Sequence, residues 1–305
     1  MASSVSFTLN SGYEIPAIGL GTWQSPDEEV YTAVTTALKC GYHHIDAALC
    51  YGNEKVVGRA LKDSGVPREK YFLTSKLWCS GHTRVAEELD KSLADLGVDY
   101  LDLYLMHWPL TLNPEGNHPL FPTKPDGSRD LLADDVWNYV DTWASMQKLV
   151  ATGKVRSIGV ANFSTVHLER LLSSPSTTIV PAVNQVELHP YNPQFRLLSY
   201  CKSKGIHVTA YSPLGSTAAP LQDEPVIKKI AEAVGHSPAQ VLIAWGVWRG
   251  TSVIPKSVTP SRIVANLVDF TLPDEYGPLI DRISETTQRR IVRPNWGVPI
   301  FLDDE

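Results

Sequence analysis

Four side chains of different chemistry stand at the ends of three successive apolar segments. Asp46 ends the first segment, and Tyr51 follows it closely. Lys76 ends the second segment, and His107 comes directly after the third. If the segments are neighbouring parallel strands, their carboxyl ends meet and the four side chains converge on one mouth. Each alone has an ordinary structural explanation, such as a capped aspartate or a satisfied core histidine, but that explanation is much weaker for the set.

Together these groups favour proton donation to a carbonyl oxygen. A lysine ammonium beside a tyrosine hydroxyl stabilises the phenolate and so lowers a pKa that starts at about 10. Tyr51 is then a candidate general acid. Asp46 would hold Lys76 charged and in place, because a buried ammonium without a partner is costly. His107 can donate a hydrogen bond to the same oxygen, which favours a carbonyl on which negative charge develops.

Such a reaction still needs a nucleophile. The set contains neither an activated serine or cysteine nor a metal-ligand cluster, and a hydride from a nicotinamide would serve. A second interpretation makes Lys76 the Schiff-base lysine of an aldolase-type barrel, but Asp46 and Tyr51 would keep it protonated. A third is a binding or regulatory protein that keeps a cofactor and turns over slowly, and the complete set of four argues against it.

A phosphate site for a nicotinamide cofactor is predicted in "VIPKSVTPSRIVAN". Lys256, Ser257, Thr259 and Arg262 share a turn between a strand and a helix, where backbone amides point outward. Two cations near hydroxyl donors suit a phosphate monoester, and hence NADP rather than NAD. The plainer alternative is a capped helix with solvated Lys and Arg. Tyr211, at the end of another strand, can stack on a nicotinamide or pack the rim.

The elements that must position these residues alternate along the chain. Short β-branched or apolar runs are separated by amphipathic stretches, as expected when crossover helices join parallel strands. The predicted strands are 17–20, 43–46, 71–76, 101–106, 155–160, 182–187, 207–211 and 253–254. The predicted helices are 28–40, 54–63, 86–96, 136–152, 166–172, 194–204, 225–234 with 238–248, and 260–267. Eight such units predict an α/β fold, the (β/α)8 TIM barrel, in a single domain spanning 1–305.

Three segments lie outside this alternation. Residues 5–15 predict an N-terminal β-hairpin around "NSG" that closes the barrel bottom. Residues 109–134 are rich in Pro and Gly without periodicity, which is typical of a functional lid loop. The tail 288–305 is too apolar for a free end, so it is either a strap over the barrel exterior or a wall of the active site.

Composition narrows the class of protein. The formal net charge of −6 offers no basic field for nucleic acid. No apolar run approaches the roughly 18 residues of a membrane span, and the start of the chain lacks a signal-peptide pattern, so a cytoplasmic protein is expected. The four cysteines show no ligand spacing, which predicts neither a disulfide framework nor a metal site. We expect a monomer or weak dimer that acts on a small molecule.

Ordered motifs resemble those of the aldo-keto reductases over nearly the whole chain. They are "GLGTW", "HHIDAALCYGNEKVVGRAL", "LTSKLW", "DYLDLYLMHWP", "GKVRSIGVANF", "NQVELHP", "AYSPLG" and "IPKSVTPSRI". The resemblance implies an NADPH-dependent carbonyl reductase in which Asp46, Tyr51, Lys76 and His107 form the catalytic tetrad. The lid further resembles fungal NADP-dependent glycerol dehydrogenases and glyceraldehyde reductases, which implies reduction of small aldehydes and, in reverse, oxidation of polyols such as glycerol. D-Galacturonate, pentoses or ketones are alternative substrates.

The same resemblance implies binding residues. Those implied for the cofactor NADPH or NADP⁺ are Gly21, Thr22, Trp23, Asn162, Gln185, Tyr211, Ser212, Leu214, Ser216, Lys256, Ser257, Val258, Thr259, Arg262 and Asn266. Those implied for the substrate are Trp23, Cys50, Trp78, His107, Trp108, Phe121 and Trp296. Ala161 stands where many relatives have a serine on the carboxamide, so Asn162 and Gln185 are expected to carry that contact. Ala265 replaces a glutamate near the adenine, which is expected to loosen cofactor binding. The short segment 215–225 predicts faster cofactor exchange than in animal aldose reductases, where a longer belt covers the pyrophosphate.

Overall fold

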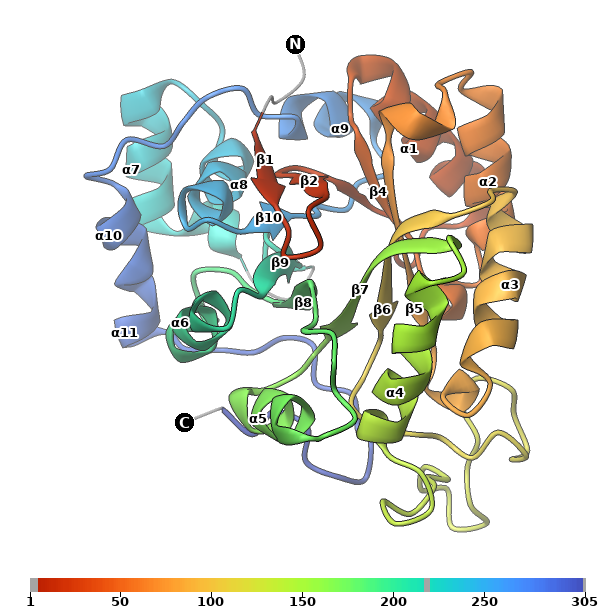
Figure 1. Cartoon of the computed structure of the whole chain (residues 1–305). Helices are drawn as coiled ribbons and strands as arrows, with labels where there is room; N and C mark the ends of the chain where they lie inside the picture. Colours follow the sequence, from red (N-terminus) through yellow and green to blue (C-terminus); the bar gives the residue numbers. More distant parts are fainter. Residues whose placement is uncertain (1–4, 217–219, 304–305) are drawn as a thin grey trace.

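A closed barrel of parallel strands forms the centre of the computed structural model, which describes residues 5–216 and 220–303 (Figure 1). The strand order around the sheet follows the sequence. The strands are β3 (Leu20–Gly21), β4 (His44–Asp46), β5 (Phe72–Leu77), β6 (Leu101–Met106), β7 (Val155–Ala161), β8 (Val183–Glu187), β9 (His207–Tyr211) and β10 (Ser252–Val253). Isolated parallel bridges join Ile18 to Val253 and Gly21 to Lys256, at the seam between first and last strand. The predicted (β/α)8 fold is confirmed.

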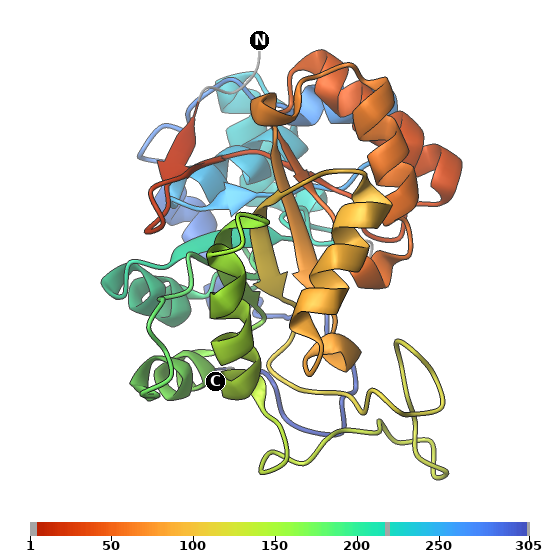
Figure 2. The same cartoon turned by 45° about the vertical axis from the view of Figure 1, so that its right-hand side comes forward.

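Helices surround the barrel, as Figures 1 and 2 show from two directions. They are α1 (Asp27–Cys40), α2 (Glu54–Asp63), α3 (Val85–Leu96), α4 (Tyr139–Val150), α5 (Thr165–Ser173), α6 (Phe195–Ser203), α7 (Pro225–Val234), α8 (Pro238–Trp248), α9 (Pro260–Asn266), α10 (Gly277–Asp281) and α11 (Ile283–Thr286). Short 3-10 turns are η1 (Leu49–Tyr51), η2 (Arg68–Lys70), η3 (Cys79–Gly81) and η4 (Leu221–Asp223). Each long helix buries an apolar stripe; in α1 it includes Val30, Ala33, Val34 and Ala37, at the spacing of one helix face.

Some element boundaries differ from the prediction. The helix predicted over 136–152 begins at Tyr139, because Asn138 forms a capping box with the first turn. The strand predicted over 17–20 is confined to Leu20–Gly21, since the backbone of Ala17 instead donates to Val5 and accepts from Val253. The helices α10 and α11 lie in a range for which no helix was predicted.

The predicted N-terminal hairpin is present at the amino-terminal end of the barrel. Strands β1 (Ser6–Thr8) and β2 (Glu14–Pro16) pair antiparallel, with Phe7 opposite Ile15. Ile15 and Leu9 are buried in one cluster with barrel residues that include Phe72 and Leu103. Burial of these side chains anchors the hairpin across the bottom of the barrel.

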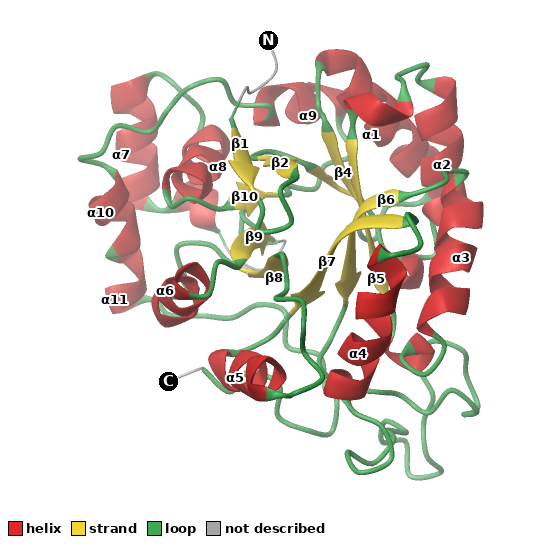
Figure 3. Cartoon of the chain, viewed as in Figure 1, coloured by secondary structure: helices red, strands yellow, loops and turns green. Residues whose placement is uncertain are grey.

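Long loops gather at the opposite end, toward which the strand arrows point (Figure 3). Residues 109–134 contain no helix or strand and are held by antiparallel bridges from Leu112 to Leu131 and from Thr123 to Arg129. The tail crosses the same end, as the dark blue trace in Figure 2 shows. The carboxyl ends of the strands therefore lie under two covering segments.

Candidate active site

Asp46, Tyr51 and Lys76 meet at the carboxyl end of the barrel. Lys76 Nζ donates to Asp46 Oδ1 at 2.5 Å and to the backbone oxygen of Ala47 at 2.8 Å. The same ammonium lies 3.3 Å from the hydroxyl of Tyr51. Asp46 and Lys76 are each 1% exposed, so this ion pair is screened little by water. The convergence expected from the strand ends is present.

Local backbone geometry places Tyr51 above the two charged residues. Asp46 ends β4, and the chain then turns through η1, where the Tyr51 amide donates to the Ala48 oxygen at 3.1 Å. Gly52 follows with a φ of 72°, a left-handed conformation that glycine adopts at little cost. The chain can thus change direction and enter α2. The Tyr51 ring remains next to Lys76, whose Nζ lies 5.1 Å from the ring centroid.

The pKa of Tyr51 departs from the expected direction. Burial raises the pKa of this hydroxyl well above its usual value, and the Asp46 charge raises it further. The expected lowering of the Tyr51 pKa by the Lys76 charge does not outweigh burial. The ammonium lies closer to the Asp46 carboxylate than to the phenol, so its charge acts mainly on Asp46. Tyr51 is therefore protonated at neutral pH and can act as a proton donor.

His107 completes the group. Its ring lies edge-on to Tyr51, with centroids 5.9 Å apart, and edge-on to Trp78 at 5.2 Å. Burial and then the Lys76 charge lower the pKa of His107 well below its usual value. The imidazole is neutral, and its Nδ1 lies 3.6 Å from Cys50 Sγ. A neutral imidazole at this place can donate a hydrogen bond to a substrate oxygen.

Aromatic rings surround the space in front of His107. The Trp296 ring lies 5.3 Å from Trp108 and 5.9 Å from Trp78 between centroids. Phe121 of the lid lies edge-on to Trp78 at 5.3 Å. The tail thus packs against the pocket aromatics, which favours the expected active-site wall over an exterior strap. Trp23 is 43% exposed and makes no ring contact within the described ranges.

The residues expected to hold a nicotinamide connect to the same cluster. Gln185 Nε2 donates to Asp46 Oδ2 at 2.7 Å. Asn162 has a left-handed φ of 63°, and its side-chain amide donates to the His107 backbone oxygen at 2.9 Å. Its side-chain oxygen accepts from the Tyr211 hydroxyl at 2.8 Å. These contacts tie β7, β8 and β9 to Asp46 and His107 through buried polar bonds.

The expected phosphate turn lies at the barrel seam. The backbone of Lys256 bridges to Gly21, beside Thr22, whose hydroxyl donates to the Asp46 backbone oxygen at 2.9 Å. The side chains of Lys256 and Arg262 are exposed and have no acidic partner within residues 5–216 and 220–303. Two uncompensated cations next to the strand ends suit a dianionic phosphate.

The remaining predicted cofactor residues lie around this turn. Ser257 Oγ accepts from the Thr259 amide at 3.1 Å, Val258 is half-buried, and Asn266 is buried at the end of α9. Ser212 and Ser216 have left-handed φ values of 49° and 54°, and the side chain of Leu214 packs against the core. Part of the segment 215–225 lies outside the described residues.

Two acidic residues that hold the tail, Glu187 and Asp303, were not predicted from the sequence. Glu187 accepts from the amides of Ile291 and Val292, each at 2.6 Å, and its Oε1 lies 2.9 Å from His189 Nε2. Asp303 accepts from the Thr165 amide at 2.5 Å at the start of α5. The acidic residue within the apolar strand of "NQVELHP" indicated that Glu187 is buried. Its role as a hydrogen-bond acceptor could not be predicted, because the donors lie in a tail that is distant in sequence.

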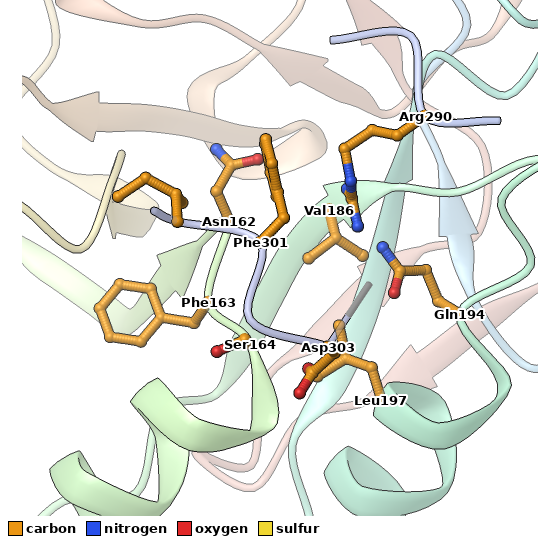
Figure 4. A pocket seen from close by; sticks show the side chains of 10 residues that line it. Asn162, Phe163, Ser164, Val186, Gln194, Leu197, Arg290, Phe301 and Asp303 are labelled. Carbon is orange, nitrogen blue, oxygen red and sulfur yellow. The ribbon is translucent and has the colours of Figure 1, made fainter. Parts of the chain in front are cut away.

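Figure 4 shows where the tail meets the barrel. Arg290, Phe301 and Asp303 of the tail line a small pocket together with Asn162 and Gln194. The Arg290 guanidinium lies over the Phe301 ring at 4.0 Å from its centroid. The pocket lies beside Asn162, so the tail anchor and the predicted nicotinamide site share a wall.

Residues 5–216 and 220–303 contain no helix with the length and apolar character needed to span a bilayer. They also contain no group of three or more His, Cys, Asp or Glu side chains placed to bind a metal ion.

The chain belongs to the Aldo/keto reductase family, whose model matches residues 17–285. It is 53% identical to the glycerol 2-dehydrogenase (NADP(+)) of Saccharomyces cerevisiae, covering 96% of each chain, and 51% identical to the D-galacturonate reductase of Hypocrea jecorina, covering 99% of each. The solved aldose reductase of Schistosoma japonicum superposes with a TM-score of 0.87 at 39% identity, covering 94% of each chain.

Proposed function

We propose that this protein reduces small aldehydes such as glyceraldehyde with NADPH and oxidises polyols such as glycerol in the reverse direction. The contact of Lys76 with both Asp46 and Tyr51, beside His107, carries the proposal. The similarity to a glycerol 2-dehydrogenase (NADP(+)) supports the choice of cofactor and of substrate class.

The residues at the mouth fit a dinucleotide with a phosphate on its ribose. Lys256 and Arg262 would hold that phosphate, because both cations are exposed and lack an acidic partner in the described chain. Asn162, Gln185 and Tyr211 would hold the nicotinamide end; the Tyr211 hydroxyl donates to the Asn162 side chain there, and Gln185 donates to Asp46. A nicotinamide cofactor held there would supply the hydride for the carbonyl carbon.

Proton transfer is then the task of the chain itself. Tyr51 donates its hydroxyl proton to the carbonyl oxygen as negative charge develops there. Lys76, held by Asp46, stabilises the phenolate that remains. His107 donates a hydrogen bond to the same oxygen and so orients the carbonyl toward the hydride donor. The aromatic wall of Trp78, Trp108 and Trp296 excludes water from this step.

One observation favours a second substrate. The Arg129 guanidinium lies 5.1 Å from the centroid of Phe121 and 6.0 Å from that of Trp296, at the pocket wall. A cation there suits an aldehyde with a distal carboxylate, and the similarity to a D-galacturonate reductase agrees with it. D-Galacturonate is therefore our second candidate.

A steady-state panel tests both candidates. Consumption of NADPH and of NADH is followed with glyceraldehyde, D-galacturonate, a pentose and a ketone, and NADP⁺ reduction is followed with glycerol. We expect NADPH to be preferred and glyceraldehyde to have the highest kcat/KM. An Arg129→Gln variant that loses activity only toward D-galacturonate would favour the second candidate. Borohydride trapping of substrate on Lys76 would overturn the reductase mechanism in favour of an aldolase.

We also propose a cytosolic, single-domain monomer or weak dimer that binds no nucleic acid. Light scattering over a range of concentrations tests the assembly state, and a single cooperative unfolding transition tests the domain count.

A further inference from the structure

The imidazole of His107 has a single polar ring partner in the described chain, and that partner is a thiol. Cys50 Sγ lies 3.6 Å from His107 Nδ1. The other side chains in contact with the ring are the aromatic groups of Tyr51, Trp78 and Trp108, whose ring centroids lie 5.9, 5.2 and 6.3 Å from that of His107. The contact with Cys50 therefore determines whether Nδ1 carries a proton.

We propose that the Cys50 thiol donates a hydrogen bond to His107 Nδ1 and thereby fixes the neutral imidazole with its single proton on Nε2. A neutral imidazole has one donor nitrogen and one acceptor nitrogen, so a bond that occupies one determines the other. With Nδ1 as acceptor, Nε2 is the donor available to a carbonyl oxygen. Cys50 is then a positioning residue, and this role in catalysis rests on the proposed reductase function.

The direction of the hydrogen bond follows from the protonation states. Burial raises the pKa of Cys50 to about 12, so the thiol keeps its proton at neutral pH. Burial lowers the pKa of His107 well below its usual value, so the ring carries one proton only. The unprotonated imidazole nitrogen is a good acceptor, whereas thiol sulfur is a weak one. S–H to Nδ1 is thus favoured over N–H to sulfur.

The opposite tautomer would weaken the proposed reaction. A proton on Nδ1 would leave a lone pair on Nε2, which would face the substrate oxygen as negative charge builds on it. Repulsion would replace a hydrogen bond. The side chain at position 50 thereby affects the reaction without touching the transferred atoms.

Nitrogen NMR of the full chain with isotope-labelled histidine tests the tautomer directly. We expect His107 Nδ1 to be unprotonated and Nε2 to be protonated at neutral pH, with His107 assigned by the signals lost in His107→Gln. Cys50→Ala is expected to give signals from protonated Nδ1. Cys79→Ala is the matched control, because this thiol is also buried near the pocket but makes no hydrogen bond with His107 within the described residues. A protonated Nδ1 in the unaltered chain, or unchanged signals in Cys50→Ala, would overturn the proposal.

Kinetics test the consequence separately. Cys50→Ala should lower kcat/KM for the best aldehyde by about 3- to 10-fold, the size of one modest hydrogen bond, with the Kd of NADPH unchanged. A changed tautomer with unchanged kcat/KM would overturn the positioning role. If the unaltered chain reduces no carbonyl at all, the proposed function fails, whereas the NMR result still decides the Cys50 to His107 bond.

Discussion

Lys76 and Asp46 form a buried ion pair that also sets the state of the neighbouring phenol. Their Nζ and Oδ1 atoms are 2.5 Å apart, whereas Nζ is 3.3 Å from the Tyr51 hydroxyl. Most of the ammonium charge is thus compensated by the carboxylate. Burial and the Asp46 charge raise the pKa of Tyr51, so its hydroxyl keeps its proton at neutral pH. Beside this ion pair Tyr51 is a protonated hydroxyl, and hence a proton donor, rather than a phenolate.

Breaking this pair is expected to cost both stability and turnover. In Asp46→Asn the Lys76 ammonium is buried without a counter-charge, so the free energy of unfolding should fall by about 3–5 kcal/mol. Urea titration measures it. The double variant Asp46→Asn with Lys76→Met should recover much of the stability but none of the activity. Full stability in the single variant would show that the pair is not electrostatically coupled.

Tyr51→Phe removes the proposed general acid and little else. We expect kcat for aldehyde reduction to fall by about 100- to 10,000-fold, because a positioned acid contributes that much. NADPH should bind as before, which fluorescence titration checks. Reduction at the unaltered rate would remove Tyr51 from the mechanism.

The pKa shifts predict different pH profiles for carbonyl reduction and for polyol oxidation. Since the pKa of Tyr51 is raised and that of His107 is lowered, the acid stays protonated and the imidazole neutral from about pH 6 to pH 9, so reduction should vary little there. Polyol oxidation needs the phenolate, so its rate should climb about tenfold per pH unit over the same range. Initial rates in both directions measure this, and a plateau in oxidation near neutral pH would contradict the raised pKa.

The cations at the seam predict the choice of cofactor. Lys256→Met and Arg262→Ala should each raise the Kd of NADPH by about 10-fold or more and leave that of NADH nearly unchanged, because only NADPH carries the additional phosphate. Titration calorimetry gives both constants. Lys229→Met, which removes an exposed cation of α7, is the matched control. Equal losses for the two cofactors would refute a phosphate role.

The tail should loosen as Glu187 loses its charge. Burial alone would raise the pKa of Glu187, but hydrogen bonds from His189, Ile291 and Val292 outweigh it and lower that pKa. A depressed folded pKa means that its stabilisation is present above about pH 4.5 and is lost as the pH falls through the folded value. Glu187→Gln should therefore speed hydrogen exchange of the Ile291 and Val292 amides at neutral pH.

The expected increase in hydrogen exchange for Glu187→Gln follows from the strength of the hydrogen bonds that it loses. A charge-assisted hydrogen bond contributes about 1.5–3 kcal/mol, so exchange should accelerate by roughly 10- to 100-fold, with a raised KM for aldehyde. Glu232→Gln on exposed α7 should change neither. Unchanged protection of both amides would mean that other contacts hold the tail.

How far the sequence could predict this protein follows from topology. Strand ends such as Lys76 and the approach of His107 were predictable, because a parallel barrel brings all carboxyl ends to one face. The contact between Cys50 and His107 and the hydrogen bonds from the tail to Glu187 could not be predicted, since they depend on side-chain direction and on segments far apart in sequence. The direction of the Tyr51 pKa was mispredicted, because burial of the hydroxyl, followed by the Asp46 charge, raises that pKa, and the sequence does not show how deeply the side chain is buried.

The seam between Gly21 and Lys256 has a consequence for biosynthesis. Its two strands come from opposite ends of the chain, so their pairing waits until most of the polypeptide has left the ribosome. Until then β3 presents an unpaired edge, the kind of surface on which nascent chains associate. Because Lys256 lies on this seam and Arg262 follows it in α9, NADPH bound there would stabilise the closed barrel by mass action.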